Sequence, residues 1–157
     1  MMRHTNSTVL ALALTLDGRW IASGSRDHTA RIWDAQLGEA VTPPLQHLDF
    51  VRTLALSPDG RRLVTSSFGR RIWFWEVFSG WAKPVFVDFL TGVYSMAFSH
   101  SGTLLALGDF DGQIHVIESA TGKPRFPPPS QDGWVDTIQF SPDDQHMVTR
   151  KSLGAKV

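Results

Sequence analysis

Short apolar segments alternate with polar turns along the whole chain, and this alternation predicts β-strands throughout. In residues 51–87, the first apolar segment contains Val51, Leu54 and Leu56 and is ended by the turn sequence SPDG. RLVTSS (62–67) and RIWFWE (71–76) are typical of second and third strands, and WAKPVFV (81–87) can form a fourth at a sheet edge, where its proline is tolerated. The pattern predicts units of four short strands.

This unit recurs at a spacing of 42 residues without gaps, with repeats starting at Val9, Val51, Val93 and Val135. A fixed period of this length indicates a repeat architecture, and four strands per unit predict β-propeller blades. We therefore expect an all-β chain of four-stranded antiparallel blades that forms an incomplete ring. The expected division is an N-terminal segment, 1–8, and a propeller segment, 9–157, whose last repeat is truncated. A fragment of a longer chain, an oligomer that completes a ring and a broken reading frame all remain open explanations.

The stretches LALSPDGRRLVTSS (54–67) and ASGSRDHTARIWD (22–34) resemble the WD-repeat β-propeller family, and the resemblance covers residues 9–157. It implies a non-enzymatic scaffold that binds other proteins or peptides. The absence of cysteine fits a reducing compartment, so we expect the protein in the cytoplasm. The proline-bearing connectors, VTPPLQHLDFV (41–51) and RFPPPSQDGWV (125–135), look most like bacterial members, some of which are attached to catalytic domains. The alternative is therefore a sensor or regulatory segment of a larger bacterial enzyme, such as a Ser/Thr kinase or an NTPase.

The resemblance also implies a buried polar network in each blade, made by a His before the first strand, a Ser or Thr in the second, an Asp in the next turn and a Trp in the third. Such groups satisfy one another once they leave water. In the first repeat Ser23, Asp27 and Trp33 occupy these positions, while Thr5 stands at the His position with His4 one residue away.

The second and third repeats depart from this network. The second keeps His47, Thr65 and Trp75 but has Gly69 in place of the Asp, so His47 needs another acceptor or water. We expect a looser upper edge in this blade. The third repeat keeps only Asp111, because Phe89, Leu107 and Ile117 replace the other three members.

Ser25, Asp27 and His28 are the three residue types of a hydrolytic triad. Alternation along the strand and the turn geometry point these side chains in different directions, whereas a triad needs mutual contact. We therefore interpret Asp27 as structural, and the other two as a strand-end and a turn residue.

In propellers that this chain resembles, partners dock on the face formed by the turns between second and third strands and by the connectors into each first strand. Aromatic and Arg side chains, the types enriched in binding hot spots, are frequent at these positions. The expected partner-binding residues are Arg26, Phe50, Arg52, Phe68, Tyr94, Phe110, Trp134 and Asp136. The plainer alternative is that Phe50 and Trp134 only fill connectors between blades.

Composition and charge exclude several other functions. Fifteen basic and fifteen acidic residues cancel, so no net charge attracts nucleic acid, and no apolar run is long enough to span a membrane. The chain has no cysteine, and its six histidines form no close cluster, so we expect no metal and no cofactor. Self-association, or contact with the rest of a longer chain, could also complete a ring.

Two further groups of charged residues have a structural interpretation. The acidic residues at first turns are single residues one repeat apart and do not form a calcium loop; they are Asp17, Asp59, Asp143 and Asp144. The arginine pairs at 61–62 and 70–71 lie in turns at opposite ends of a strand and do not converge.

Overall fold

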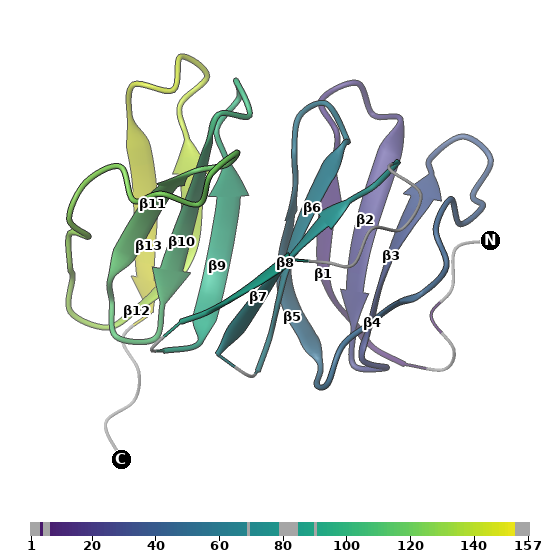
Figure 1. The fold of residues 1–157 in the computed structure, drawn as a ribbon, viewed down its shortest axis with the longest axis horizontal. Helices are drawn as coiled ribbons and strands as arrows, with labels where there is room; N and C mark the ends of the chain where they lie inside the picture. Colours follow the sequence, from purple (N-terminus) through teal and green to yellow (C-terminus); the bar gives the residue numbers. More distant parts are fainter. Residues whose placement is uncertain (1–3, 5–6, 69, 79–84, 90, 153–157) are drawn as a thin grey trace.

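The computed structural model describes residues 4, 7–68, 70–78, 85–89 and 91–152. The strands within these residues form four antiparallel sheets, one for each repeat, which we call blades 1 to 4 (Figure 1). Among the described residues, no helix is long and apolar enough to cross a membrane.

Thirteen strands make up the blades. Blade 1 consists of β1 (Val9–Leu14), β2 (Trp20–Ser25), β3 (Thr29–Asp34) and β4 (Leu45–Gln46). Blade 2 consists of β5 (Val51–Leu56), β6 (Arg62–Ser67), β7 (Arg71–Glu76) and β8 (Val85–Asp88). Blade 3 contains β9 (Val93–Phe98), β10 (Leu104–Asp109) and β11 (Ile114–Glu118), and blade 4 contains β12 (Trp134–Phe140) and β13 (Met147–Ser152).

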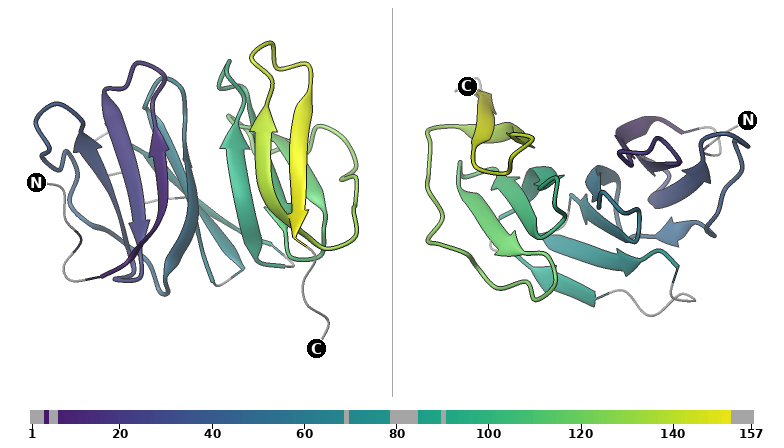
Figure 2. Two further views of the ribbon diagram at one scale, coloured as in Figure 1. Left: turned by 180° about the vertical axis from the view of Figure 1, so that it is seen from behind. Right: turned by 90° about the horizontal axis from the view of Figure 1, so that it is seen from above.

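The blades stand side by side in an open arc, which Figure 2 shows from above. The first strands β1, β5, β9 and β12 lie along its inner side, and each contacts the first strand of the next blade. Apolar clusters fill each of the three interfaces between blades. Between blades 1 and 2, for example, Ala22 and Ile32 pack with Val51, Leu54 and Leu56. Fully burying a side chain of the size of Val or Leu contributes about 1.5–3 kcal/mol, so these interfaces hold the arc together.

A β-bulge interrupts the first strand of every blade at the residue that follows the repeat valine. In blade 1, Val9 pairs with Ser25 but Ala11 pairs with Gly24, so Leu10 is the extra residue. The same shift makes Arg52, Tyr94 and Asp136 the extra residues of the other blades. A bulge leaves its extra residue outside the ladder and re-aims that side chain.

The expectation of four strands per blade holds for blades 1 and 2 but is wrong for blade 3. The segment after β11 makes only isolated bridges, Gln113 with Ser130 and Ile117 with Pro124. Prolines 127–129 have no N–H to donate, so a continuous ladder cannot form there. In blade 4 the described residues contain two strands, and the expected third strand falls on residues outside those described.

Candidate functional site

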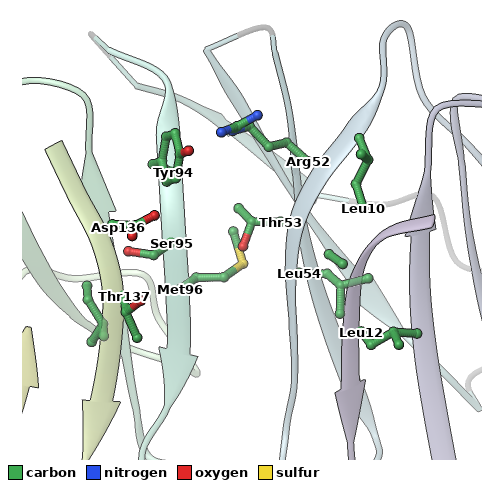
Figure 3. Close-up of a pocket in the computed structure, with 12 residues that line it drawn as sticks. Leu10, Leu12, Arg52, Thr53, Leu54, Tyr94, Ser95, Met96, Asp136 and Thr137 are labelled. Atoms are coloured by element: carbon green, nitrogen blue, oxygen red, sulfur yellow. The ribbon is translucent and has the colours of Figure 1, made fainter. Parts of the chain in front are cut away.

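The first strands together form a concave surface on the inner side of the arc. It encloses a hollow of about 490 Å³, lined by three successive positions from each of β1, β5, β9 and β12. The bulge residues Leu10, Arg52, Tyr94 and Asp136 all line it. Figure 3 shows Arg52, Tyr94 and Leu10 toward one end of this surface. The bulge in each first strand is therefore what directs these side chains to the inner side of the arc.

Five of the expected partner-binding residues form one connected group, which we call the rim cluster: Arg52, Phe68, Tyr94, Phe110 and Trp134. The Arg52 guanidinium carbon lies 4.0 Å from the Tyr94 ring centroid and 5.3 Å from that of Phe68. Tyr94 packs edge-on against Phe110 at 5.2 Å, and Trp134 lies 5.4 Å from Phe110 and 5.9 Å from Tyr94. The cluster thus joins blades 2, 3 and 4, and Phe68 and Trp134 in it are exposed.

Gly92 permits this packing. A Cβ at position 92 would lie 2.8 Å from Cε2 of Phe110, so any side chain here would displace that ring. The backbone N–H of Phe110 also donates to the carbonyl of Gly92, at 3.2 Å. The turn after β10 is therefore held against the connector that precedes β9.

The other three expected partner-binding residues lie outside this cluster. The guanidinium carbon of Arg26 lies 5.8 Å from the ring centroid of Phe50, which also packs edge-on against His28 at 5.2 Å. Asp136 lines the concave surface but is ion-paired with Arg150 of β13. Sequence reasoning missed His28 and Arg150 as neighbours of this face, although His28, which has a positive φ of 66°, marks the turn beside Arg26.

The polar network of blade 1 is complete, with His4 rather than Thr5 as its histidine. Ser23 Oγ accepts the indole N–H of Trp33 at 2.8 Å and lies 2.7 Å from His4 Nε2. His4 Nδ1 lies 2.9 Å from Asp27 Oδ2, and the Thr29 hydroxyl donates to Oδ1. Partial burial raises the pKa of Asp27, but the hydrogen bonds from Thr29 and His4 outweigh it, and the net effect is a lowered pKa.

In blade 2, His47 meets a backbone acceptor in place of the missing carboxylate. Its Nδ1 lies 2.9 Å from the carbonyl oxygen of Leu45, and its Nε2 lies 2.7 Å from Thr65 Oγ1. The indole N–H of Trp75 donates to the same hydroxyl at 2.9 Å. Burial lowers the pKa of His47 to about 4, so its imidazole is neutral near pH 7. Gly69 itself, and with it the expected looseness of this edge, lies outside the described residues.

In blade 3 the choice of Asp111 as the network carboxylate is wrong, because Asp109 makes the hydrogen bonds. Asp109 is buried and accepts from the Thr91 hydroxyl at 2.9 Å and from the backbone N–H groups of Asp111 and Gln113. His115 Nε2 lies 3.1 Å from the same carboxylate. Asp111 is exposed and supplies only its backbone N–H to this group. Because Leu107 and Ile117 stand at the Ser and Trp positions of this repeat, the Asp111 carboxylate has no such polar partner inside the blade.

Two hydroxyls among the described residues do meet an imidazole, Ser23 with His4 and Thr65 with His47, but both are buried and each also accepts an indole N–H, so we interpret them as structural. The residues singled out as a triad in the sequence do not meet. Ser25 Oγ accepts the backbone N–H of Asp27 at 3.2 Å, while the ring of His28 packs against Phe50. Asp109 and His115 line a second hollow of about 390 Å³ between blades 2 and 3, but there Thr91 donates to the carboxylate and not to the imidazole. A triad requires the hydroxyl to bond the base.

The acidic residues of the first turns accept hydrogen bonds from within those turns. Ser57 donates its hydroxyl to Asp59 at 2.6 Å, and this bond, followed by that from the backbone N–H of Arg61, lowers the pKa of Asp59. Thr15 with Asp17 and Ser141 with Asp143 repeat the arrangement. Among the described residues no group of three or more His, Cys, Asp or Glu side chains is placed to hold a metal ion. The arginines at 62 and 71 pair with Glu76 and Asp88 on separate strands.

Comparison with known proteins agrees with this geometry. The family model for the WD domain, G-beta repeat, matches residues 1–34, 42–76 and 84–118. The fold is similar to the crystal structure of the β-propeller domain of Cps50 (Swd1) from Myceliophteria thermophila, with a TM-score of 0.82 at 14% sequence identity. That match covers 96% of this chain and 51% of the other, so the chain spans about half the length of that domain. No match was found among curated proteins.

Proposed function

Because this chain belongs to the WD40 family of G-beta repeats, whose members generally serve as protein-interaction scaffolds, we propose that it binds protein or peptide partners through the rim cluster and catalyses no reaction. The observation that carries the proposal is the continuous set of contacts from Arg52 to Phe68 and Tyr94, and from Tyr94 to Phe110 and Trp134, which joins three blades. Aromatic and Arg residues dominate binding hot spots.

The rim cluster is well suited to binding because its side chains already hold one another. Contacts of an arginine with an aromatic face contribute about 0.5–2 kcal/mol each, and pairs of aromatic rings about 0.5–1.5 kcal/mol. Side chains that are held in place before a partner arrives lose less rotamer freedom on binding. Phe68 and Trp134 remain exposed and offer apolar area to a partner.

The charge at this site indicates the chemistry of the partner. Arg52 Nε is buried and has no hydrogen-bond partner among the described residues. The nearby Asp136 carboxylate is ion-paired with Arg150. A segment with an acidic side chain next to an aromatic or aliphatic one would meet Arg52 and the rings of Tyr94 and Trp134 together. We therefore propose an acidic, apolar peptide segment as the ligand.

The experiment is selection from a library of displayed random peptides, followed by titration of the selected peptides against the purified chain. The variants Arg52→Ala and Trp134→Ala should weaken binding by about thirtyfold, which corresponds to a hot-spot loss of about 2 kcal/mol. Selected sequences should contain an acidic residue beside an apolar one.

Blade 2 offers a matched control. The guanidinium carbon of Arg71 lies 4.1 Å from the ring centroid of Phe86, nearly the same geometry as Arg52 on Tyr94, but on the outer strands β7 and β8. Arg71→Ala and Phe86→Ala should leave peptide affinity unchanged. Equal affinity of the rim variants and the unmodified chain would contradict the assignment of the rim cluster.

A further inference from the structure

The second hollow, of about 390 Å³ between blades 2 and 3, is separate from the rim cluster and shares no residue with it. It is bounded by the outer strands β7 and β8 of blade 2, by the end of β10, by β11 and by the proline-bearing segment 122–128. Its volume lies within the range of about 300–1,000 Å³ that is usual for small-molecule sites. The hollow is therefore large enough to hold a small organic molecule.

The hollow exists because blade 3 has smaller residues where blade 2 has three rings. In blade 2, Trp73 packs against Trp75 at 5.9 Å and against Phe86 at 5.4 Å. The bridge between Gln113 and Ser130 has the register of the β7–β8 pair, so the two blades can be compared position by position. The equivalent residues in blade 3, all of which line the hollow, are His115, Ile117 and Pro128.

One part of the wall is polar and centres on Asp109, which is 2% exposed. Its carboxylate accepts from the Thr91 hydroxyl and from two backbone N–H groups, and His115 Nε2 lies 3.1 Å from it. Because a carboxylate only accepts, Nε2 carries the proton of this bond, and Nδ1 of the neutral ring is an acceptor. Among the described residues Nδ1 has no hydrogen-bond partner. A ligand that meets this ring must therefore bring a donor.

The charge of the wall selects the kind of donor. Among the described residues, the carboxylates of Asp88, Asp109 and Asp111 line the hollow, and no Lys or Arg side chain does. Asp88 is ion-paired with Arg71, and Asp109 is satisfied by the donors named above. The exposed Asp111 carboxylate forms no ion pair within the described part of the chain. This remaining negative charge repels an anion and favours a cation.

The rest of the wall is apolar and partly aromatic. Phe89 packs edge-on against the ring of His115 at 5.2 Å, and Phe126, Pro124 and Ile117 line the same hollow. Such a wall excludes water from an apolar ligand body, and aromatic faces also attract a cation. The wall thus combines a place for a ring with a place for a positive charge.

We propose that this hollow binds a small primary amine with an aromatic body. The ammonium group has three N–H donors: it donates to Nδ1 of His115, and the Asp111 carboxylate balances its charge. The ring of the ligand packs among Phe89, Phe126 and Ile117. This site lies on the outer strands of the arc and does not depend on peptide binding at the rim cluster.

The test compares three probes that share a phenyl ring and the same two-carbon spacer: phenethylamine, phenethyl alcohol and hydrocinnamate. They are a cation, a neutral molecule and an anion near pH 7. NMR titration of the purified chain follows the backbone N–H groups of Asp111 and Gln113, which bond Asp109. The amine should bind about tenfold more tightly than the alcohol, because a hydrogen bond between charged groups is the stronger one. Hydrocinnamate should bind most weakly.

Three variants separate charge from space, and circular dichroism checks that each is folded. Asp111→Asn removes only a charge, so the amine should bind no more tightly than the alcohol, whose affinity should not change. Pro128→Phe restores the ring that blade 2 has at this position and should abolish binding of both probes by filling the hollow. Asp132→Asn, an exposed aspartate outside the hollow, is the matched control and should change neither affinity.

Saturable binding in this order of affinities, altered by the two site variants and not by the control, supports the proposal. It is overturned if phenethylamine does not bind saturably, or if the alcohol binds equally well. It is also overturned if Asp111→Asn and Pro128→Phe, both folded, leave the affinity for the amine unchanged. A lysine side chain is another source of an ammonium group, so tighter binding of acetyl-lysine methylamide than of phenethylamine would contradict the assignment of a free aromatic amine.

Discussion

Protonation of His47 should destabilise this fold in mildly acidic solution. The imidazole is buried between Thr65 and the carbonyl of Leu45, and it packs against the rings of Trp73 and Trp75. Among the described residues no carboxylate pairs with it, in contrast to His4, which lies beside Asp27. A positive charge on His47 would therefore stay uncompensated in an apolar setting.

The magnitude follows from the pKa of His47, which burial lowers from 6.5 to about 4. Because the unfolded chain binds the proton more tightly, stability is fully present above pH 6.5 and is lost as the pH falls toward 4. Each unit of difference corresponds to about 1.4 kcal/mol, so the total loss is about 3 kcal/mol, of which about 2 kcal/mol is lost between pH 7 and pH 5.

The assay is urea unfolding, followed by tryptophan fluorescence, at several pH values between 7 and 5. Other groups also titrate in this range, so the comparison is with His47→Gln, which keeps a polar side chain but takes up no proton. The variant should be less stable at pH 7 and should lose about 2 kcal/mol less than the unmodified chain on going to pH 5. Equal pH slopes for the two proteins, or an NMR titration of His47 with a midpoint near 6.5, would refute the reasoning.

Three further predictions concern stability and are checked by the same unfolding measurement at pH 7. Ser23→Ala removes the hydroxyl that bonds both the Trp33 indole and the His4 imidazole. It should lower the free energy of unfolding by about 1–3 kcal/mol, because both rings stay buried and lose this partner. Asp109→Asn should lower the free energy of unfolding by about 2 kcal/mol, whereas Asp111→Asn should change it by less than about 0.5 kcal/mol. Equal losses would contradict the assignment of Asp109 as the buried carboxylate of blade 3. Gly24→Ala should lower the free energy of unfolding by about 1–3 kcal/mol, since the new methyl group overlaps Val51. An unchanged urea midpoint would show that the interface between blades 1 and 2 accommodates the methyl group without strain.

The sequence predicts the blades well because buried residues recur at the same positions of every repeat. Val51, Val93 and Val135 recur at one spacing since each must fit the same kind of seat on the preceding blade. Fixed spacing fails where connectors vary in length. His4 lies five residues before Val9 but His47 lies only four before Val51, so the period alone places the first histidine one residue too late.

The error in blade 3 has a different cause. Alignment by the repeat selects Asp111, but the carboxylate that turns inward is the one with donors within reach, which is Asp109. A charged residue at the end of the otherwise apolar strand LLALGD (104–109) was the available signal, because buried carboxylates require partners. Residue types indicated the aromatic members of the rim cluster. Their contacts with one another depend on Gly92 and on the approach of three blades, and no local sequence pattern contains that information.

The bulge in each first strand separates two roles of that strand: packing between blades, and presenting a side chain on the inner side of the arc. It sets Leu10, Arg52, Tyr94 and Asp136 outside the ladder, while in blades 2 to 4 the preceding valine stays buried in the packing between blades. Four chemically unrelated side chains therefore occupy one structural position without disturbing the valines beside them. A combinatorial library restricted to these four positions should consequently yield proteins that keep the same blades and differ in what they bind.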